Sequence, residues 1–184
     1  MALGLWRKFS AKTKRILVIV AFFVLSVIMT TAGILTPLSD EEIDAFGREL
    51  EDTQSSVRSM PTTQQVSFIF GNNFMICLVG FVPVIGPIFE SYVLYSTGVV
   101  ITGYSMYKHY QVNPLMLFFS LFLFPFTWLE FLAYSTAMAE SFWLFWRVIK
   151  RKGKLEIKNT CILVSICAVM LLVGAVIEAA LISL

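Results

Sequence analysis

Long apolar stretches alternate with short polar blocks along most of the chain. Residues 16–35 and 160–183 are almost free of charged side chains, and each is long enough to cross a bilayer core, which needs about 20 apolar residues as a helix. Three more crossings fit in between, at about 66–81, 88–107 and 126–146. The pattern therefore predicts an all-α integral membrane protein with about five transmembrane helices.

The apolar pattern is interrupted at two places in the central region. Pro83, Gly86 and Pro87 break one apolar run, and we favour a tight turn there over a broken helix. Residues 115–124 are apolar but too short to cross as a helix before Pro125. We therefore expect a broken or re-entrant segment near 115–125, with its free backbone groups buried in protein.

One amphipathic helix is predicted between the first two crossings. Ser39 and Glu42 have the spacing of a capping box at its start. Met60 should end it, because the following Pro61 disfavours helical geometry in its predecessor. Its polar face is strongly acidic, which is typical of a solvated helix and also suits a basic partner.

The charged residues predict how the chain is threaded through the membrane. They are basic before residue 16, acidic between 40 and 52, and basic again from 147 to 158. Lys and Arg favour the cytoplasmic side of a cell membrane. The N-terminus is therefore predicted on the cytoplasmic side and the acidic helix on the extracytoplasmic side. The predicted regions are a basic interfacial helix (1–15), a first crossing (16–35), the extracytoplasmic acidic helix (36–65), a core with three crossings (66–147), a basic cytoplasmic loop (148–159) and a last crossing (160–184).

Composition narrows the function classes. Hydrophobic residues make up 58% of the 184 residues, charged residues only 14%, and the mean hydropathy is +0.80, which excludes a soluble domain with a polar surface. The sequence lacks phosphate-binding, nucleophile and metal-ligand motifs. Its three cysteines lack metal-binding spacing and are interpreted as small hydrophobic residues. We expect no enzymatic activity, no cofactor, no metal and no nucleic-acid partner.

Carboxyl groups inside the apolar runs are the main candidate functional groups. No Lys or Arg lies within those runs to neutralise them, and a carboxylate facing lipid is costly. Glu90 and Glu130 are therefore expected to be protonated at neutral pH, or to share a proton or a bound cation. The alternative is a neutral acid that hydrogen-bonds a neighbouring helix. The acids concerned are Glu90, Glu130, Glu140 and Glu178.

Two amides and a strip of small residues point to helix contacts. Asn72 and Asn73 lie in an apolar run and need hydrogen-bond partners, so we include them as site candidates. Small residues that recur every four positions let a neighbouring backbone approach closely. The strip is either an oligomer interface or, as we favour, packing within the chain. The small residues are Ala133, Ala137 and Ser141, with Gly98 and Gly103 on the preceding helix.

A weak internal similarity relates two of these regions. Pro87 and Glu90 precede a Tyr-Ser-Thr sequence at 95–97, and Pro125 and Glu130 precede another at 134–136. In the predicted topology the two copies run in opposite directions. Proline-interrupted segments in inverted halves are typical of transporters, where they mark a binding site near the midplane.

Taken together, these motifs resemble the stage II sporulation protein M family over about residues 66–146. The resemblance depends on Phe70 to Asn73, on Gly80, on the 83–87 break, and on Pro125 to Glu130. By position, the matching residues are Asn73, Gly98, Gly103, Pro125 and Glu130. Thr97 stands where the family usually has Asn, and Phe126 and Thr127 stand where it has His and Gly.

The resemblance implies a non-enzymatic membrane scaffold or partner-binding subunit, since the sporulation member helps to hold cell-wall hydrolases in place. Its expected partners are membrane lipid and other membrane proteins or a second copy of itself. A first alternative is a small transporter or channel component that binds a proton or cation at Glu90 and Glu130. A second is an accessory subunit of a larger membrane enzyme.

Overall fold

The computed structural model describes residues 9–110, 112–151 and 153–183. Within these residues all the regular structure is α-helical. The helices are α2 (Ala11–Ile34), α3 (Asp40–Ser59), α4 (Thr62–Gly80), α5 (Ile85–Tyr107), α6 (Pro114–Leu121), α7 (Pro125–Ile149) and α8 (Gly153–Ile182). The prediction of an all-α chain is confirmed for this part of the sequence.

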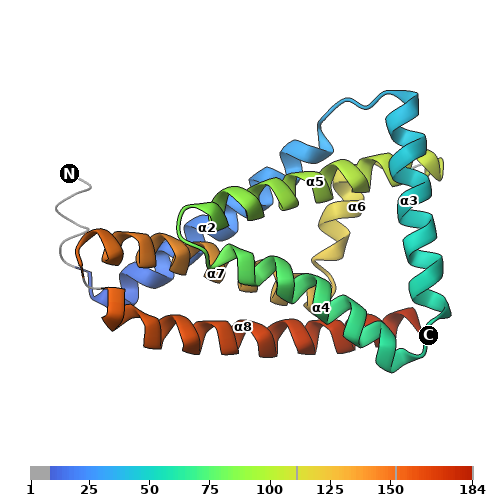
Figure 1. Cartoon of the computed structure of the whole chain (residues 1–184). Coiled ribbons are helices and arrows are strands. Elements are labelled where there is room, and N and C mark those ends of the chain that lie inside the picture. The colour runs from blue at the N-terminus through green and yellow to red at the C-terminus, as the bar shows by residue number, and fades with distance from the viewer. Residues whose placement is uncertain (1–8, 111, 152, 184) are drawn as a thin grey trace.

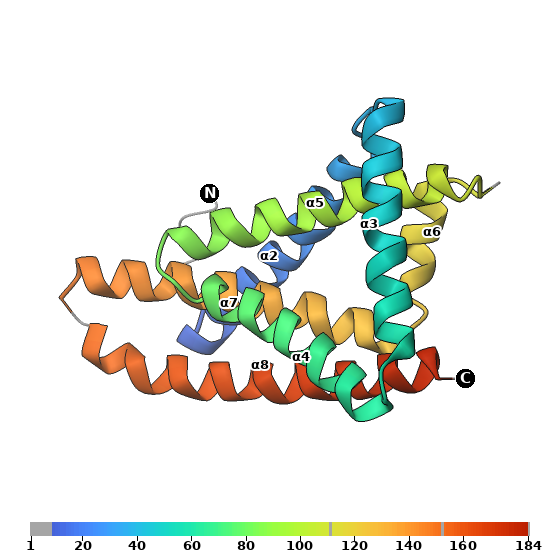
Figure 2. The same ribbon diagram turned by 45° about the vertical axis from the view of Figure 1, so that its right-hand side comes forward.

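Five long helices lie along one axis and form the body of the molecule (Figure 1). Helices α2, α5 and α8 run in one direction, and α4 and α7 run back. Helices α3 and α6 instead lie across this axis (Figure 2). We call the end where α3 lies the acidic end and the opposite end, where α2 begins and α7 stops, the basic end.

Among the described residues, two helices have the length and apolar character needed to cross a membrane, α2 and the part of α8 from Glu156 to Ile182. Helices α6 and α7 together give a third candidate span, but they are bent by 87° at the break between them. Helices α4 and α5 carry more polar side chains, and they pack against α8 and α2. The chain is a membrane protein, and its five crossings and orientation stay a prediction.

Helix α3 begins and ends where the sequence indicates. The capping box of Ser39 and Glu42 is present, and the helix ends at Ser59. Three contacts with α5 and the residue after it fix α3 across the acidic end. Gly47 lies so close to Tyr107 that an added Cβ would meet its ring at 2.2 Å, the Tyr104 hydroxyl donates to Gln54 at 3.1 Å, and Lys108 pairs with Glu51.

The predicted break before α7 is present, and side chains satisfy the backbone groups it exposes. The Thr127 hydroxyl donates to the Leu121 carbonyl at 2.8 Å. The Trp128 indole donates to the Phe122 carbonyl, also at 2.8 Å. Free carbonyls at a helix end are costly in an apolar environment, so these two bonds stabilise the sharp bend.

Small residues allow the central helices to pack closely. A Cβ added at Gly98 of α5 would lie 2.1 Å from the Thr30 carbonyl oxygen of α2. The predicted strip on α7, Ala133, Ala137 and Ser141, is buried inside the chain. A Cβ at Gly103 would meet Phe46 of α3 at 3.0 Å.

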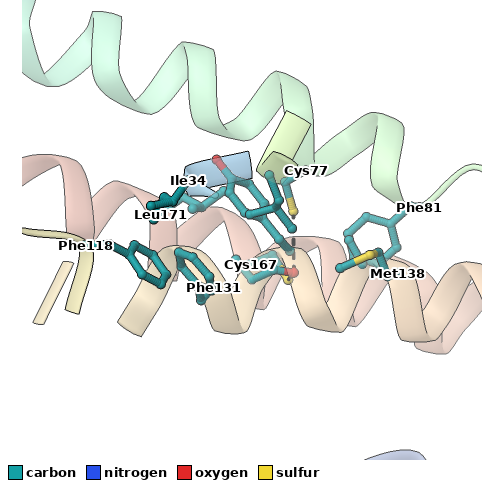
Figure 3. Close-up of a cluster of buried hydrophobic side chains, with 12 residues drawn as sticks. Ile34, Cys77, Phe81, Phe118, Phe131, Met138, Cys167 and Leu171 are labelled. Carbon is teal, nitrogen blue, oxygen red and sulfur yellow. Dashed lines mark hydrogen bonds between the residues drawn. The ribbon is translucent and has the colours of Figure 1, made fainter. Parts of the chain in front are cut away.

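The core between α4, α7 and α8 contains two buried thiols (Figure 3). Cys77 and Cys167 both donate to the Ala133 carbonyl, at 3.9 and 3.6 Å. Both are free cysteines packed among hydrophobic side chains, whereas the third, Cys161, is exposed.

The boundaries of two predicted regions differ from the helices. Residues 11–15, which we assigned to an interfacial helix, form the first turns of α2, whose N-cap is Ser10. Residues 1–8 of that prediction lie outside the described part of the chain. Helix α8 begins at Gly153, several residues before the predicted start of the last crossing.

Candidate functional site

Polar side chains gather at three places along the bundle. The acidic-end pocket lies next to α3 and is lined by Glu130. The central carboxyl is Glu90, which is enclosed by helices on all sides. The basic-end cluster joins Arg15, Glu140, Arg147, Glu156 and Thr160. Burying a carboxyl group is costly unless it is hydrogen-bonded or paired with a charge, and the three places differ in the partners that the carboxyl groups have.

The acidic-end pocket is a cavity of about 450 Å³ between α3, α4, α7 and α8. Asn73 of α4 donates to Glu130 of α7 at 2.6 Å. This bond joins two helices through residues that are 57 positions apart in the sequence. Glu178 of α8 lines the same cavity, and Arg58 and Gln54 of α3 line it too. The volume lies in the range of small-ligand sites.

The two predicted amides therefore have different positions. Asn73 is half-buried and bonds Glu130, as expected for an amide in an apolar helix. Asn72 is exposed, and its amide donates only to the neighbouring Asn73, at 3.4 Å. Carboxyl and carboxamide oxygens suit a proton or a hard cation. No group of three or more His, Cys, Asp or Glu with metal-binding geometry occurs among the described residues.

Glu90 is fully buried, and neither of its carboxyl oxygens has a hydrogen-bond partner among the described residues. A glycine provides the space for it, since a Cβ at Gly80 would lie 2.2 Å from Glu90 Oε1. Gly86 in turn approaches the Gly80 carbonyl so closely that its own Cβ would lie 1.9 Å away. The close approach of these two glycines thus leaves space for a carboxyl group that no described side chain neutralises.

The basic-end cluster corrects one expectation about Glu140. We expected no cation near the acids of the apolar runs, yet Arg15 of α2 lies 2.8 Å from Glu140 of α7. Thr160 of α8 also donates to Glu140, at 2.7 Å. The reason for the error is spatial, because Arg15 belongs to a basic segment 125 residues earlier in the chain.

A second buried carboxyl completes this cluster. Glu156 of α8 is 1% exposed and pairs with Arg15, and also with Arg147 of α7 at 3.2 Å. Asn159 donates to it at 3.3 Å. Sequence reasoning missed Glu156 because it lies in a block of basic residues at 147–158 that reads as a solvated loop.

The family resemblance missed the role of Thr127. Thr127 stands where the family usually has Gly. Its hydroxyl donates to the Leu121 carbonyl and so stabilises the bend between α6 and α7. The two halves of the internal similarity also differ in environment, since Glu130 has an amide partner and Glu90 has none.

Comparison with protein families gives a match over most of the chain. No curated protein and no solved structure matches this chain. The sequence model of the family described as Stage II sporulation protein M matches residues 16–181. The match extends from the start of α2 almost to the end of α8, well beyond the central region that carries the motifs. The chain therefore belongs to the stage II sporulation protein M family.

Proposed function

We propose that this protein is a non-enzymatic, multi-pass subunit of the cell membrane that holds partner proteins against the exposed side of α3. One observation carries the proposal: a rigidly fixed acidic helix lies across one end of an apolar bundle (Figure 2). A scaffold needs a surface whose position is set by the membrane domain, and the contacts of α3 with α5 supply it.

The charge of α3 indicates the chemistry of the partner. Its exposed carboxylates include four that have no side-chain hydrogen bond or ion pair to the bundle within the described part of the chain, Asp40, Glu41, Glu49 and Asp52. Asp44 pairs only with Arg48 within the same helix, at 3.5 Å between exposed side chains. Such a surface pair is weak. A partner with a basic surface would therefore meet a row of available carboxylates.

Photo-crosslinking in cells tests this proposal. A photoreactive residue at Glu49 should form a defined crosslinked product with another protein, whereas one at Val169 on the exposed side of α8 should not. Reversing charge with Glu41→Lys and Asp52→Lys together should abolish the product. Changing Ser56 to Lys on the same helix is the control for an added cation. Products that persist after the double reversal would contradict the proposal.

The acidic-end pocket favours a second candidate, a small transporter or channel component that binds a proton or cation at Glu130. Its support is the cavity that Glu130 and Glu178 line together. Flux into proteoliposomes separates the two candidates. Proton or cation flux that Glu130→Gln abolishes would establish transport, and Glu140→Gln controls for general damage to a buried acid.

A further inference from the structure

We propose that a groove at the basic end binds one anionic phospholipid, a role beyond the partner binding proposed above. The groove has a volume of about 470 Å³ and lies between α2, α7 and α8. Ile16, Ile19, Ala139, Ile162 and Leu163 form its apolar walls, and its polar lining includes Lys12, Arg15, Glu140, Trp143 and Asn159. An apolar slot with basic groups beside it matches an acyl chain below a charged headgroup.

Trp143 supplies a hydrogen-bond donor that the described protein leaves unused. Its Nε1 is buried and has no acceptor among the described residues. Buried donors without a partner are rare, because they lose their hydrogen bonds to water and gain nothing. A phosphate oxygen in the groove would accept this bond. The Arg15 guanidinium lies 5.9 Å from the centre of the Trp143 ring, so the indole sits beside a cation.

The carboxylates of the basic-end cluster do not oppose an anion, because cations and donors already occupy their oxygens. Glu140 accepts from Arg15 and Thr160. Glu156 pairs with Arg15 and Arg147 and accepts from Asn159. Among these described side chains and Lys12, three cations face two carboxylates.

Lys12 provides the remaining positive charge. It is exposed, lines the groove, and has no ion pair within the described residues. An ammonium group and an indole N–H beside one apolar slot both donate, and neither accepts. The complementary ligand is a lipid whose phosphate carries a net negative charge, and a zwitterionic lipid would add an ammonium group next to Lys12.

Lipid retention in native mass spectrometry tests the proposal on the full-length protein in detergent. The probes are phosphatidylglycerol, phosphatidylcholine with the same acyl chains, and soluble glycerol phosphate. We expect retention of one phosphatidylglycerol at least tenfold above phosphatidylcholine. Trp143→Phe removes the N–H donor together with part of the ring and should lower that retention severalfold, and Lys12→Ala should act in the same direction.

Matched variants separate the groove from general attraction to a basic surface. Trp146→Phe and Lys150→Ala alter a neighbouring indole and ammonium that face each other at 4.6 Å outside the groove, and should leave retention unchanged. Without lipid, any fall in the thermal midpoint of Trp143→Phe should come from the smaller ring alone, because the N–H has no partner to lose among the described residues. Equal retention of both lipids, equal loss in the Trp146 variant, or complete displacement by glycerol phosphate would each overturn the proposal.

Discussion

The basic-end cluster and Glu90 bury the same chemical group in opposite ways. Glu140 and Glu156 are 1% exposed and meet arginines from α2 and α7, whereas Glu90 is 0% exposed and meets no partner. An ionised carboxylate without compensation is very costly in an apolar interior, so a group in that position is neutral instead. The two sites therefore show that the buried acids of this protein do not all have the same surroundings, and they need not share one role.

The difference also separates structure from candidate function. The ion pairs of the basic-end cluster join α2 to α7 and α8, which is a structural role. The Glu130 carboxyl is intermediate between the paired acids and Glu90, since it lines a cavity and accepts one hydrogen bond from an amide. Substitutions that remove one partner at a time distinguish the three sites by the size of their effect.

The largest effect is expected from Arg15→Met, which leaves two buried carboxylates with less compensation. Removing one partner of a buried ion pair costs about 3–5 kcal/mol. The free energy of unfolding in detergent should fall by that amount, measured by thermal and denaturant unfolding. Adding Glu140→Gln to the same chain should recover part of the loss, and an Arg15 variant as stable as the original would disprove the ionic cluster.

The next effect compares one substitution at two sites. Glu140→Gln leaves one acceptor oxygen where there were two, so it removes at least one hydrogen bond to a charged group, and such a bond contributes about 1.5–3 kcal/mol. Glu90→Gln removes no hydrogen bond made by the described residues and keeps the volume, so it should lower the free energy of unfolding by less than Glu140→Gln does. Unfolding of both variants in the same detergent decides the matter, and a greater loss at Glu90 would show that its carboxyl has a partner.

Asn73→Ala should lower stability by about 1 kcal/mol, the usual net contribution of one hydrogen bond. The adjacent Asn72→Ala is the matched control, because its exposed amide bonds only Asn73. Thermal unfolding should separate the two variants. Equal effects of the neighbouring changes would argue against the contact between α4 and α7.

The smallest effect is expected at the solvated ion pair of the acidic end. The hydrogen bond from Lys108 lowers the pKa of the Glu51 carboxyl, and the same bond raises the pKa of Lys108. The carboxyl's contribution is therefore complete above the ordinary pKa of glutamate and is lost as pH falls through the lowered value. The ammonium's contribution is lost as pH rises through the raised value.

Glu51→Gln should consequently reduce the thermal midpoint slightly at neutral pH and have no effect in acid below both values of the carboxyl pKa. The change should be smaller than that of Arg15→Met, Glu140→Gln or Asn73→Ala, since an exposed pair is screened by solvent. Glu49→Gln on the same helix serves as control. A Glu51 variant that loses as much stability in acid as at neutral pH would contradict the pairing.

The sequence by itself determined the features that depend on neighbouring residues. Apolar runs require helices in lipid because every backbone group must be satisfied internally. The capping box fixed the start of α3, and Pro125 fixed the break before α7. These are local effects of side chains on the backbone within one or two turns. The motifs between residues 66 and 146 likewise indicated the family.

Only the tertiary structure decided which polar groups meet. Arg15 and Glu140 are 125 residues apart, and neither local pattern contains a sign of the other. Glu90 and Glu140 read alike as single acids in apolar runs, yet helix packing brings an arginine to one and a glycine to the other. Compensation of a buried charge depends on distance in space, and the packing of helices far apart in the chain sets that distance.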